Sequence, residues 1–138
     1  METAERHAIE HECSRLVRAY CVHIDAYRHA EVVALFAEDG VWETWKGPMR
    51  GRAAMQAYLD AKDTKPTTIH TVQNIMVDVV SEREASGTSV FLYFGTDRSD
   101  PTATVPKVVG RYFDKYVLTP AGWRIAHRRT DMTFRSQQ

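Results

Sequence analysis

The sequence predicts an α+β fold in which three N-terminal helices pack on a curved, mostly antiparallel sheet. Helical patterns fill the chain up to Pro66, and strand patterns separated by turn-forming residues fill the rest. Helices that precede a run of consecutive antiparallel strands are typical of α+β proteins. The chain has 138 residues, 43% of them hydrophobic, which is the size of a single domain spanning residues 1–138.

Three helices are predicted in the first half of the chain. The first covers residues 5–24, where apolar residues recur at the spacing of one helix face: Ile9, Cys13, Leu16, Val17, Tyr20, Cys21 and Ile24. The second is the short stretch HAEVVALFAEDG, with Gly40 as its stop signal. The third is RAAMQAYLDAKD, closed by Lys65 and Pro66. Between the second and third helices, VWETW alternates as a short strand.

The second half of the chain predicts four long strands, at residues 67–81, 86–97, 105–118 and 122–134. A curved sheet closed on one side by helices encloses space that side chains do not fill, so a pocket is expected at its concave face. The large residues predicted to line this pocket and bind substrate are Trp42, Trp45, Phe94, Tyr112 and Met132. Ordinary core packing is the simpler interpretation of each of them taken alone.

Charge and composition argue against several function classes. Eighteen basic and eighteen acidic residues give a net charge of zero, which favours neither nucleic acid nor an anionic membrane as partner. No apolar stretch reaches the roughly 20 residues of a membrane span, and the N-terminus lacks the core of a signal peptide, so a cytoplasmic location is expected. Cys13 and Cys21 lie about 12 Å apart along one helix, too far for a disulfide, and are predicted to be free and buried.

His70, in the stretch TIHTVQN, is the first candidate for chemistry. It lies in a predicted strand and shares one face with Val72, Asn74 and Met76, because side chains alternate along a strand. No cysteine or second histidine lies nearby in the sequence, so we expect no metal site and no cofactor. A carboxylate that fixes the tautomer of such a histidine leaves its other ring nitrogen free as a base.

Asp25 is the candidate carboxylate. It ends the first helix, where the helix dipole disfavours negative charge, so stability alone gives no reason for it. The alternative is that Asp25 caps the next helix. Tyr20 lies five residues earlier, a rotation of about 140°, so the two residues meet at one pocket only if they bracket it or the helix end unwinds. Core packing of Tyr20 is the alternative.

The cluster HRRT at residues 127–130 also has two interpretations. Such a cluster is usually a solvated strand edge that blocks pairing with other chains. One arginine that points inward would instead bind a leaving group or a developing oxyanion.

Four stretches together resemble the SnoaL-like branch of the nuclear transport factor 2-like (NTF2-like) superfamily. They are DAYRHAEVVALFAEDGVWE, KGPMRGRAAMQAYL, IHTVQN and GRYFDKYVLTPAGWRIAHRR, and the resemblance covers nearly the entire chain. It implies an NTF2-like cone and a homodimer or higher homo-oligomer. The superfamily includes dehydratases, isomerases, cyclases and noncatalytic binding proteins, so the fold alone does not define the function.

The chain most resembles the members with an aspartate/histidine dyad: scytalone dehydratase, bile acid 7α-dehydratase and hexachlorocyclohexane dehydrochlorinase. In these, the aspartate ends the first helix and the histidine opens the first long strand, which corresponds to Asp25 and His70. The resemblance adds Tyr20 and Arg128 as catalytic candidates. Strand alternation would place Arg128 on the face opposite Trp123 unless a bulge intervenes.

The sequence therefore predicts a cofactor-independent lyase that eliminates water from a small apolar substrate, aromatic or polycyclic. Asp25 would orient His70 as the base, and Tyr20 with Arg128 would hydrogen-bond the departing hydroxyl or an enolate oxygen. Isomerisation, cyclisation and retro-aldol cleavage begin with the same proton abstraction and stay open. A noncatalytic small-molecule-binding or assembly module is the alternative from another class.

Overall fold

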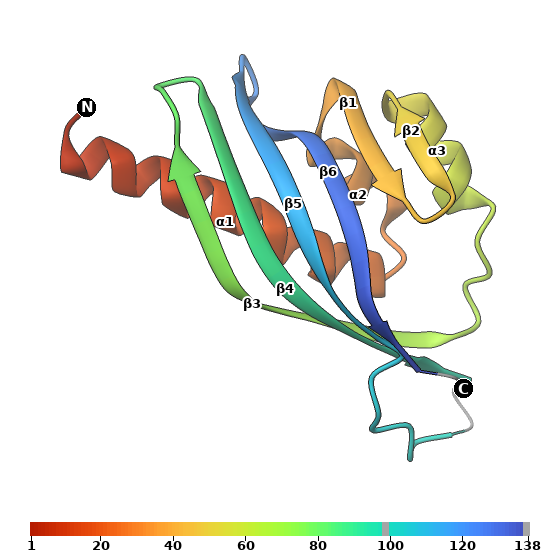
Figure 1. The fold of residues 1–138 in the computed structure, drawn as a ribbon. Helices are drawn as coiled ribbons and strands as arrows, with labels where there is room; N and C mark the ends of the chain where they lie inside the picture. The colour runs from red at the N-terminus through yellow and green to blue at the C-terminus, as the bar shows by residue number, and fades with distance from the viewer. Residues whose placement is uncertain (98–99, 137–138) are drawn as a thin grey trace.

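The computed structural model describes residues 1–97 and 100–136, which form an open, curved, mixed sheet of six strands with three helices (Figure 1). The strand order is β2-β1-β6-β5-β4-β3. The elements are α1 (Thr3–Asp25), α2 (His29–Ala34), β1 (Phe36–Thr44), β2 (Gly47–Arg50), α3 (Arg52–Asp60), β3 (Thr67–Val79), β4 (Glu84–Thr96), β5 (Val108–Thr119) and β6 (Gly122–Arg135). The predicted α+β class, the first helix and the four long strands are confirmed.

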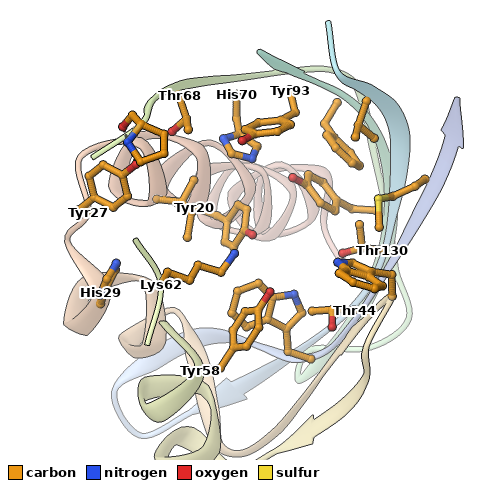
Figure 2. Close-up of a pocket in the computed structure, with 18 of the residues that line it drawn as sticks. Tyr20, Tyr27, His29, Thr44, Tyr58, Lys62, Thr68, His70, Tyr93 and Thr130 are labelled. Atoms are coloured by element: carbon orange, nitrogen blue, oxygen red, sulfur yellow. Dashed lines mark hydrogen bonds between the residues drawn. The ribbon is translucent and has the colours of Figure 1, made fainter. Parts of the chain in front are cut away.

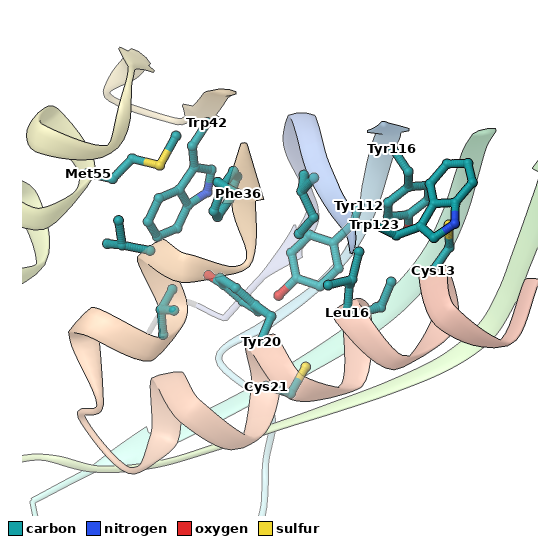
Figure 3. Close-up of a cluster of buried hydrophobic side chains, with 14 of the residues drawn as sticks. Cys13, Leu16, Tyr20, Cys21, Phe36, Trp42, Met55, Tyr112, Tyr116 and Trp123 are labelled. Carbon is teal, nitrogen blue, oxygen red and sulfur yellow. The ribbon is translucent and has the colours of Figure 1, made fainter. Parts of the chain in front are cut away.

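The long helix α1 crosses the concave face of the sheet (Figure 1). Its buried residues are the predicted stripe, from Ile9 to Cys21, and they meet aromatic residues of the sheet in one core (Figure 3). Cys13 and Cys21 are both buried and free, as predicted. None of the helices in the described part of the chain is long and apolar enough to cross a membrane.

The prediction for the region between α1 and α3 was partly wrong. The second helix ends at Ala34, and the chain continues at Phe36 as β1, so Gly40 lies inside a strand instead of ending a helix. Phe36 is fully buried, and β1 pairs in parallel with β6, so tertiary pairing overrides the local helical pattern. The prediction that three helices precede all of the strands is also inexact, because α3 follows β1 and β2.

Strand β3 contains a bulge that changes which side chains face the interior. The register with β4 shifts between Gln73 and Met76, and Asn74 has a left-handed φ of 54°. A bulge adds one residue and so reverses the alternation beyond it. His70 and Val72 face inward before the bulge and Ile75 after it, whereas Met76 is 64% exposed. The expectation that Asn74 and Met76 share the face of His70 was therefore wrong.

The bulge requires a residue at position 74 that tolerates a left-handed φ, which can be tested. Asn74→Val should lower the free energy of unfolding by about 1 to 2 kcal/mol, because a β-branched residue adopts left-handed φ only with strain. Asn74→Gly is the matched control and should stay within about 0.5 kcal/mol of the wild type. Urea denaturation measures both, and equal stability of the two variants would contradict the role given to the bulge.

Candidate active site

A pocket of about 360 Å³ opens between α1, the concave face of the sheet and the segment that follows α3 (Figure 2). Aromatic residues form a large part of its walls, among them Tyr20, Trp42, Tyr58, Phe91, Tyr93 and Tyr112. Trp45 and Met132 also line it. A cavity of this kind, apolar with a few polar groups, is typical of small-molecule sites.

Phe94 is the one predicted lining residue that lies elsewhere. It pairs across the sheet with Ile69, which is 55% exposed, whereas the neighbouring pair Tyr93 and His70 faces the pocket. Successive side chains of a strand point to opposite faces, so Phe94 belongs to the outer face. Phe91 and Tyr93 take the place predicted for it.

Asp25 and His70 meet at the pocket. The Nδ1 of His70 lies 2.6 Å from Oδ1 of Asp25, and the backbone N–H of His70 donates to Oδ2 at 2.6 Å. The hydroxyl of Thr68 donates to Oδ1 at 2.9 Å. An ionised carboxylate only accepts hydrogen bonds, so Nδ1 carries the proton in this arrangement and Nε2 is left free.

The topology explains why an aspartate stands at this helix end. Strand β3 is an edge of the sheet, so its outward N–H groups lack a partner strand. Asp25, the last residue of α1, supplies the acceptor for the N–H of His70. The capping interpretation was wrong, because the N-cap of α2 is Arg28 and has no side-chain cap.

Aromatic rings hold the imidazole of His70 in place. The ring centroids of Tyr93 and Tyr20 lie 4.8 and 6.4 Å from that of the imidazole, and the Tyr20 ring is nearly perpendicular to it (Figure 2). Gly95 leaves room for Tyr93, because a Cβ at this position would lie 2.6 Å from the tyrosine hydroxyl. His70 is thus fixed by a carboxylate on one side and packed rings on others, and its side chain is only 14% exposed.

Tyr20 lines the pocket from the continuous helix α1, whereas Asp25 at the helix end does not line it and contacts it through His70. Tyr20 is 6% exposed and lies on the pocket wall, while Asp25 reaches past it to β3. Burial raises the pKa of the Tyr20 hydroxyl well above its ordinary value, and the Arg128 charge opposes this only in part. Tyr20 therefore stays protonated at neutral pH and can donate a hydrogen bond, but is not a base.

Arg128 lies behind the pocket wall and does not line the pocket. The register of β5 and β6 shifts at Lys115/Tyr116, which marks a bulge. The bulge reverses the alternation of β6, so Arg128 lies on the same buried face as Trp123. The solvated-edge interpretation of HRRT was wrong, since β6 lies between β1 and β5 and Arg128 is fully buried. Only Arg129, on the opposite face, is exposed.

The buried guanidinium of Arg128 has a carboxylate partner and two ring partners. Nε and Nη2 donate to the two oxygens of Asp114 at 2.8 and 2.9 Å, and the Tyr116 hydroxyl donates to the same carboxylate at 3.0 Å. The guanidinium carbon lies 3.9 Å from the ring centroid of Tyr112 and 4.5 Å from that of Tyr20. Arg128 therefore packs against the rings of Tyr20 and Tyr112 from behind the pocket wall, and its hydrogen bonds to Asp114 also lie there.

His29 and Lys62 are among the pocket residues that the sequence analysis did not predict. His29, at the start of α2, lines the pocket with its Nδ1 3.3 Å from Asp60, and Lys62, two residues after α3, also lines it (Figure 2). Both lie in or beside short helices whose sequence has no periodic signal for the pocket. Within residues 1–97 and 100–136, no group of three histidine, cysteine, aspartate or glutamate residues is placed to hold a metal ion.

Comparisons with known proteins agree with this architecture. A family model described as a SnoaL-like domain matches residues 5–129. A candidate scytalone dehydratase from Novosphingobium aromaticivorans has 26% identity and a TM-score of 0.86, covering 99% of this chain and 92% of that one. A protein of unknown function from Mycobacterium tuberculosis has 25% identity and a TM-score of 0.76, covering 86% and 72%.

A more distant structure shares the fold alone. The hexachlorocyclohexane dehydrochlorinase of Novosphingobium barchaimii has 15% identity and a TM-score of 0.82, covering 98% of this chain and 93% of that one. No curated protein sequence matches the chain significantly.

The buried ion pair can be tested by removing its partners in turn. Arg128→Met should lower the free energy of unfolding by about 3 to 5 kcal/mol, because it leaves the Asp114 carboxylate buried without its cation. Adding Asp114→Asn should recover part of this loss, since the uncompensated charge is then gone. Urea denaturation of the two single variants and the double variant measures the coupling, and strictly additive losses would contradict it.

Proposed function

The chain belongs to the SnoaL-like domain family, and from this premise we propose that it is a cofactor-independent lyase of the dehydratase type. The observation that carries the proposal is the 2.6 Å contact between His70 Nδ1 and Asp25 Oδ1 at the wall of an apolar pocket. The similar structure from N. aromaticivorans, a candidate scytalone dehydratase, supports an elimination reaction. Fold alone would not select this activity.

His70 is the proposed base. With the proton of Nδ1 donated to Asp25, Nε2 has a free lone pair, and the ring lies on the pocket wall where a substrate would bind. Asp25 acts as a positioning residue, since it fixes the tautomer and the ring orientation. Its own contacts are the hydrogen bonds to β3.

The proposed elimination needs one base and balances without a cofactor. Nε2 of His70 removes a proton from a carbon beside a carbonyl group, and the freed electron pair is held as an enolate. The enolate then forms the carbon–carbon double bond as the carbon–oxygen bond of the leaving hydroxyl breaks. The imidazolium returns its proton to the departing oxygen, so water leaves and His70 is again neutral.

Tyr20 is the proposed donor to the developing negative oxygen. Its hydroxyl is protonated at neutral pH and has no hydrogen-bond partner among the described residues. A preorganised donor in a buried site stabilises an oxyanion more than it stabilises a neutral carbonyl. Arg128 would act indirectly, because its guanidinium lies against the ring of Tyr20.

The walls favour an apolar ring system as substrate. Aromatic side chains of Trp42, Phe91 and Tyr112 line a volume of about 360 Å³, in the lower range of small-molecule pockets. We therefore propose a small aromatic or polycyclic compound with a hydroxyl group at the carbon next to an activated C–H bond.

The role of Asp25 can be tested before any substrate is known. Nitrogen-15 NMR of His70 at neutral pH should show the tautomer with Nδ1 protonated, and Asp25→Ala should abolish this preference because the acceptor is lost. Asp60→Ala, which removes the carboxylate beside His29, is the matched control and should leave the His70 signals unchanged. An unaltered tautomer in Asp25→Ala would contradict the positioning role.

Turnover tests the role of His70. For any hydroxylated aromatic or polycyclic ketone that the wild type dehydrates, His70→Ala should lower kcat by about 10² to 10⁴-fold, the usual contribution of a general base. An active His70→Ala variant would exclude this base. Equal ligand binding by both proteins without turnover would favour a noncatalytic binding module.

A further inference from the structure

Lys62 projects a positive charge into the pocket from its rim. Its backbone N–H donates to the carbonyl oxygen of Leu59 at 3.0 Å, which ties the residue to the end of α3. The side chain extends toward Tyr20, and it enters the pocket from a different side than His70 (Figure 2). The ammonium nitrogen lies 4.7 Å from the ring centroid of Tyr58.

No carboxylate of residues 1–97 and 100–136 forms an ion pair with this ammonium group. The ion pairs among the described residues involve other cations: His29, His70, His127 and Arg128. The acids near the pocket have their own partners, since Asp60 accepts from Gln56 and contacts His29, and Asp25 is bound to β3. Asp63, at the rim itself, accepts the backbone N–H of Lys65 at 3.0 Å.

Arg135 is a second cation at the pocket rim that lies beside an aromatic ring. It lines the pocket from the end of β6, with its guanidinium carbon 6.0 Å from the ring centroid of Trp45, and it has no ion pair with any residue that the structure describes. Cations beside aromatic faces are held by the ring electrostatics without being neutralised. Among the described residues, the rim thus carries two cations that form no ion pair, together with the carboxylate of Asp63, above an interior rich in aromatic side chains.

We propose that the pocket selects substrates that carry a carboxylate, and that Lys62 binds this group. The inference rests on the proposed function only in sharing its pocket. The ring system of the substrate would contact the aromatic walls with its reactive carbon at His70, and its carboxylate would meet Lys62 in a charge-assisted hydrogen bond. Arg135 would add attraction at longer range. The substrate class is therefore an aromatic or polycyclic acid.

The test compares two probes that differ only in charge, 2-naphthoate and 2-naphthamide. Binding to the full chain is followed by quenching of tryptophan fluorescence, since Trp42 and Trp45 line the pocket. The wild type should bind the carboxylate about five- to tenfold more tightly than the amide, because the cation is partly exposed and screened. Lys62→Met should abolish this preference and leave the affinity for the amide unchanged.

Lys65→Met is the matched control. Lys65 lies in the same segment but does not line the pocket, so its replacement should preserve the preference. Raising the salt concentration should weaken naphthoate binding and not naphthamide binding. Equal affinities for the two probes in the wild type, a preference that survives Lys62→Met, or no naphthoate binding at millimolar concentration would each overturn the proposal.

The same assay separates this inference from the proposed function. His70→Ala retains Lys62 and the pocket walls, so the preference for the carboxylate should persist in that variant. If His70 is not a base but the charge preference is found, the dehydratase proposal fails and the ligand class stands. If the preference is absent while His70→Ala abolishes turnover of a neutral ketone, the ligand class fails and the dehydratase proposal stands.

Discussion

The contact between Asp25 and strand β3 is the constraint on which the site depends. One carboxylate accepts hydrogen bonds from the Thr68 hydroxyl, the His70 backbone and the His70 ring, and so joins the end of α1 to an otherwise unpaired sheet edge. The three bonds offset the unfavourable position of a negative charge at a helix C-terminus. Structure and chemistry share the same atoms here, because the group that secures the edge strand also fixes the imidazole.

The buried charge of Arg128 supports the part of the wall formed by Tyr20 and Tyr112. Arg128 and Asp114 form a paired charge cluster behind Tyr20 and Tyr112, where burial raises the pKa of both tyrosines. Burial of a charge is costly unless it is paired and hydrogen-bonded; Nε and Nη2 of Arg128 are bound to Asp114, whereas Nη1 is buried without a hydrogen-bond partner among the described residues. Neutral tyrosine side chains therefore line this part of the pocket while the charges of Arg128 and Asp114 stay behind their rings, which suits a wall that stabilises negative charge only as it develops.

The polar groups of the pocket are divided between its wall and its rim. His70 and Tyr20 lie on the wall among aromatic rings, whereas Lys62 and Arg135 approach from the rim and form no ion pair with a described residue. Apolar walls provide affinity for rings of many kinds, and a few placed polar groups decide orientation and selectivity. In this arrangement, recognition of a substrate and its chemistry are assigned to different parts of the pocket.

The sequence alone determined the fold class, the helix stripe of α1 and the pairing of Asp25 with His70, because these depend on local periodicity and on motifs with fixed places in a known family. It did not determine features that depend on contacts distant in sequence. Parallel pairing with β6 turned a helical pattern around Gly40 into a strand, and register shifts set the faces of Met76 and Arg128. Strand alternation places Phe91 and Tyr93, and not Phe94, at the pocket. His29 and Lys62 reach the pocket only because α2 and α3 pack against the sheet. A bulge or a helix packing angle arises from the sum of many weak contacts, so it leaves no pattern in any short stretch of sequence.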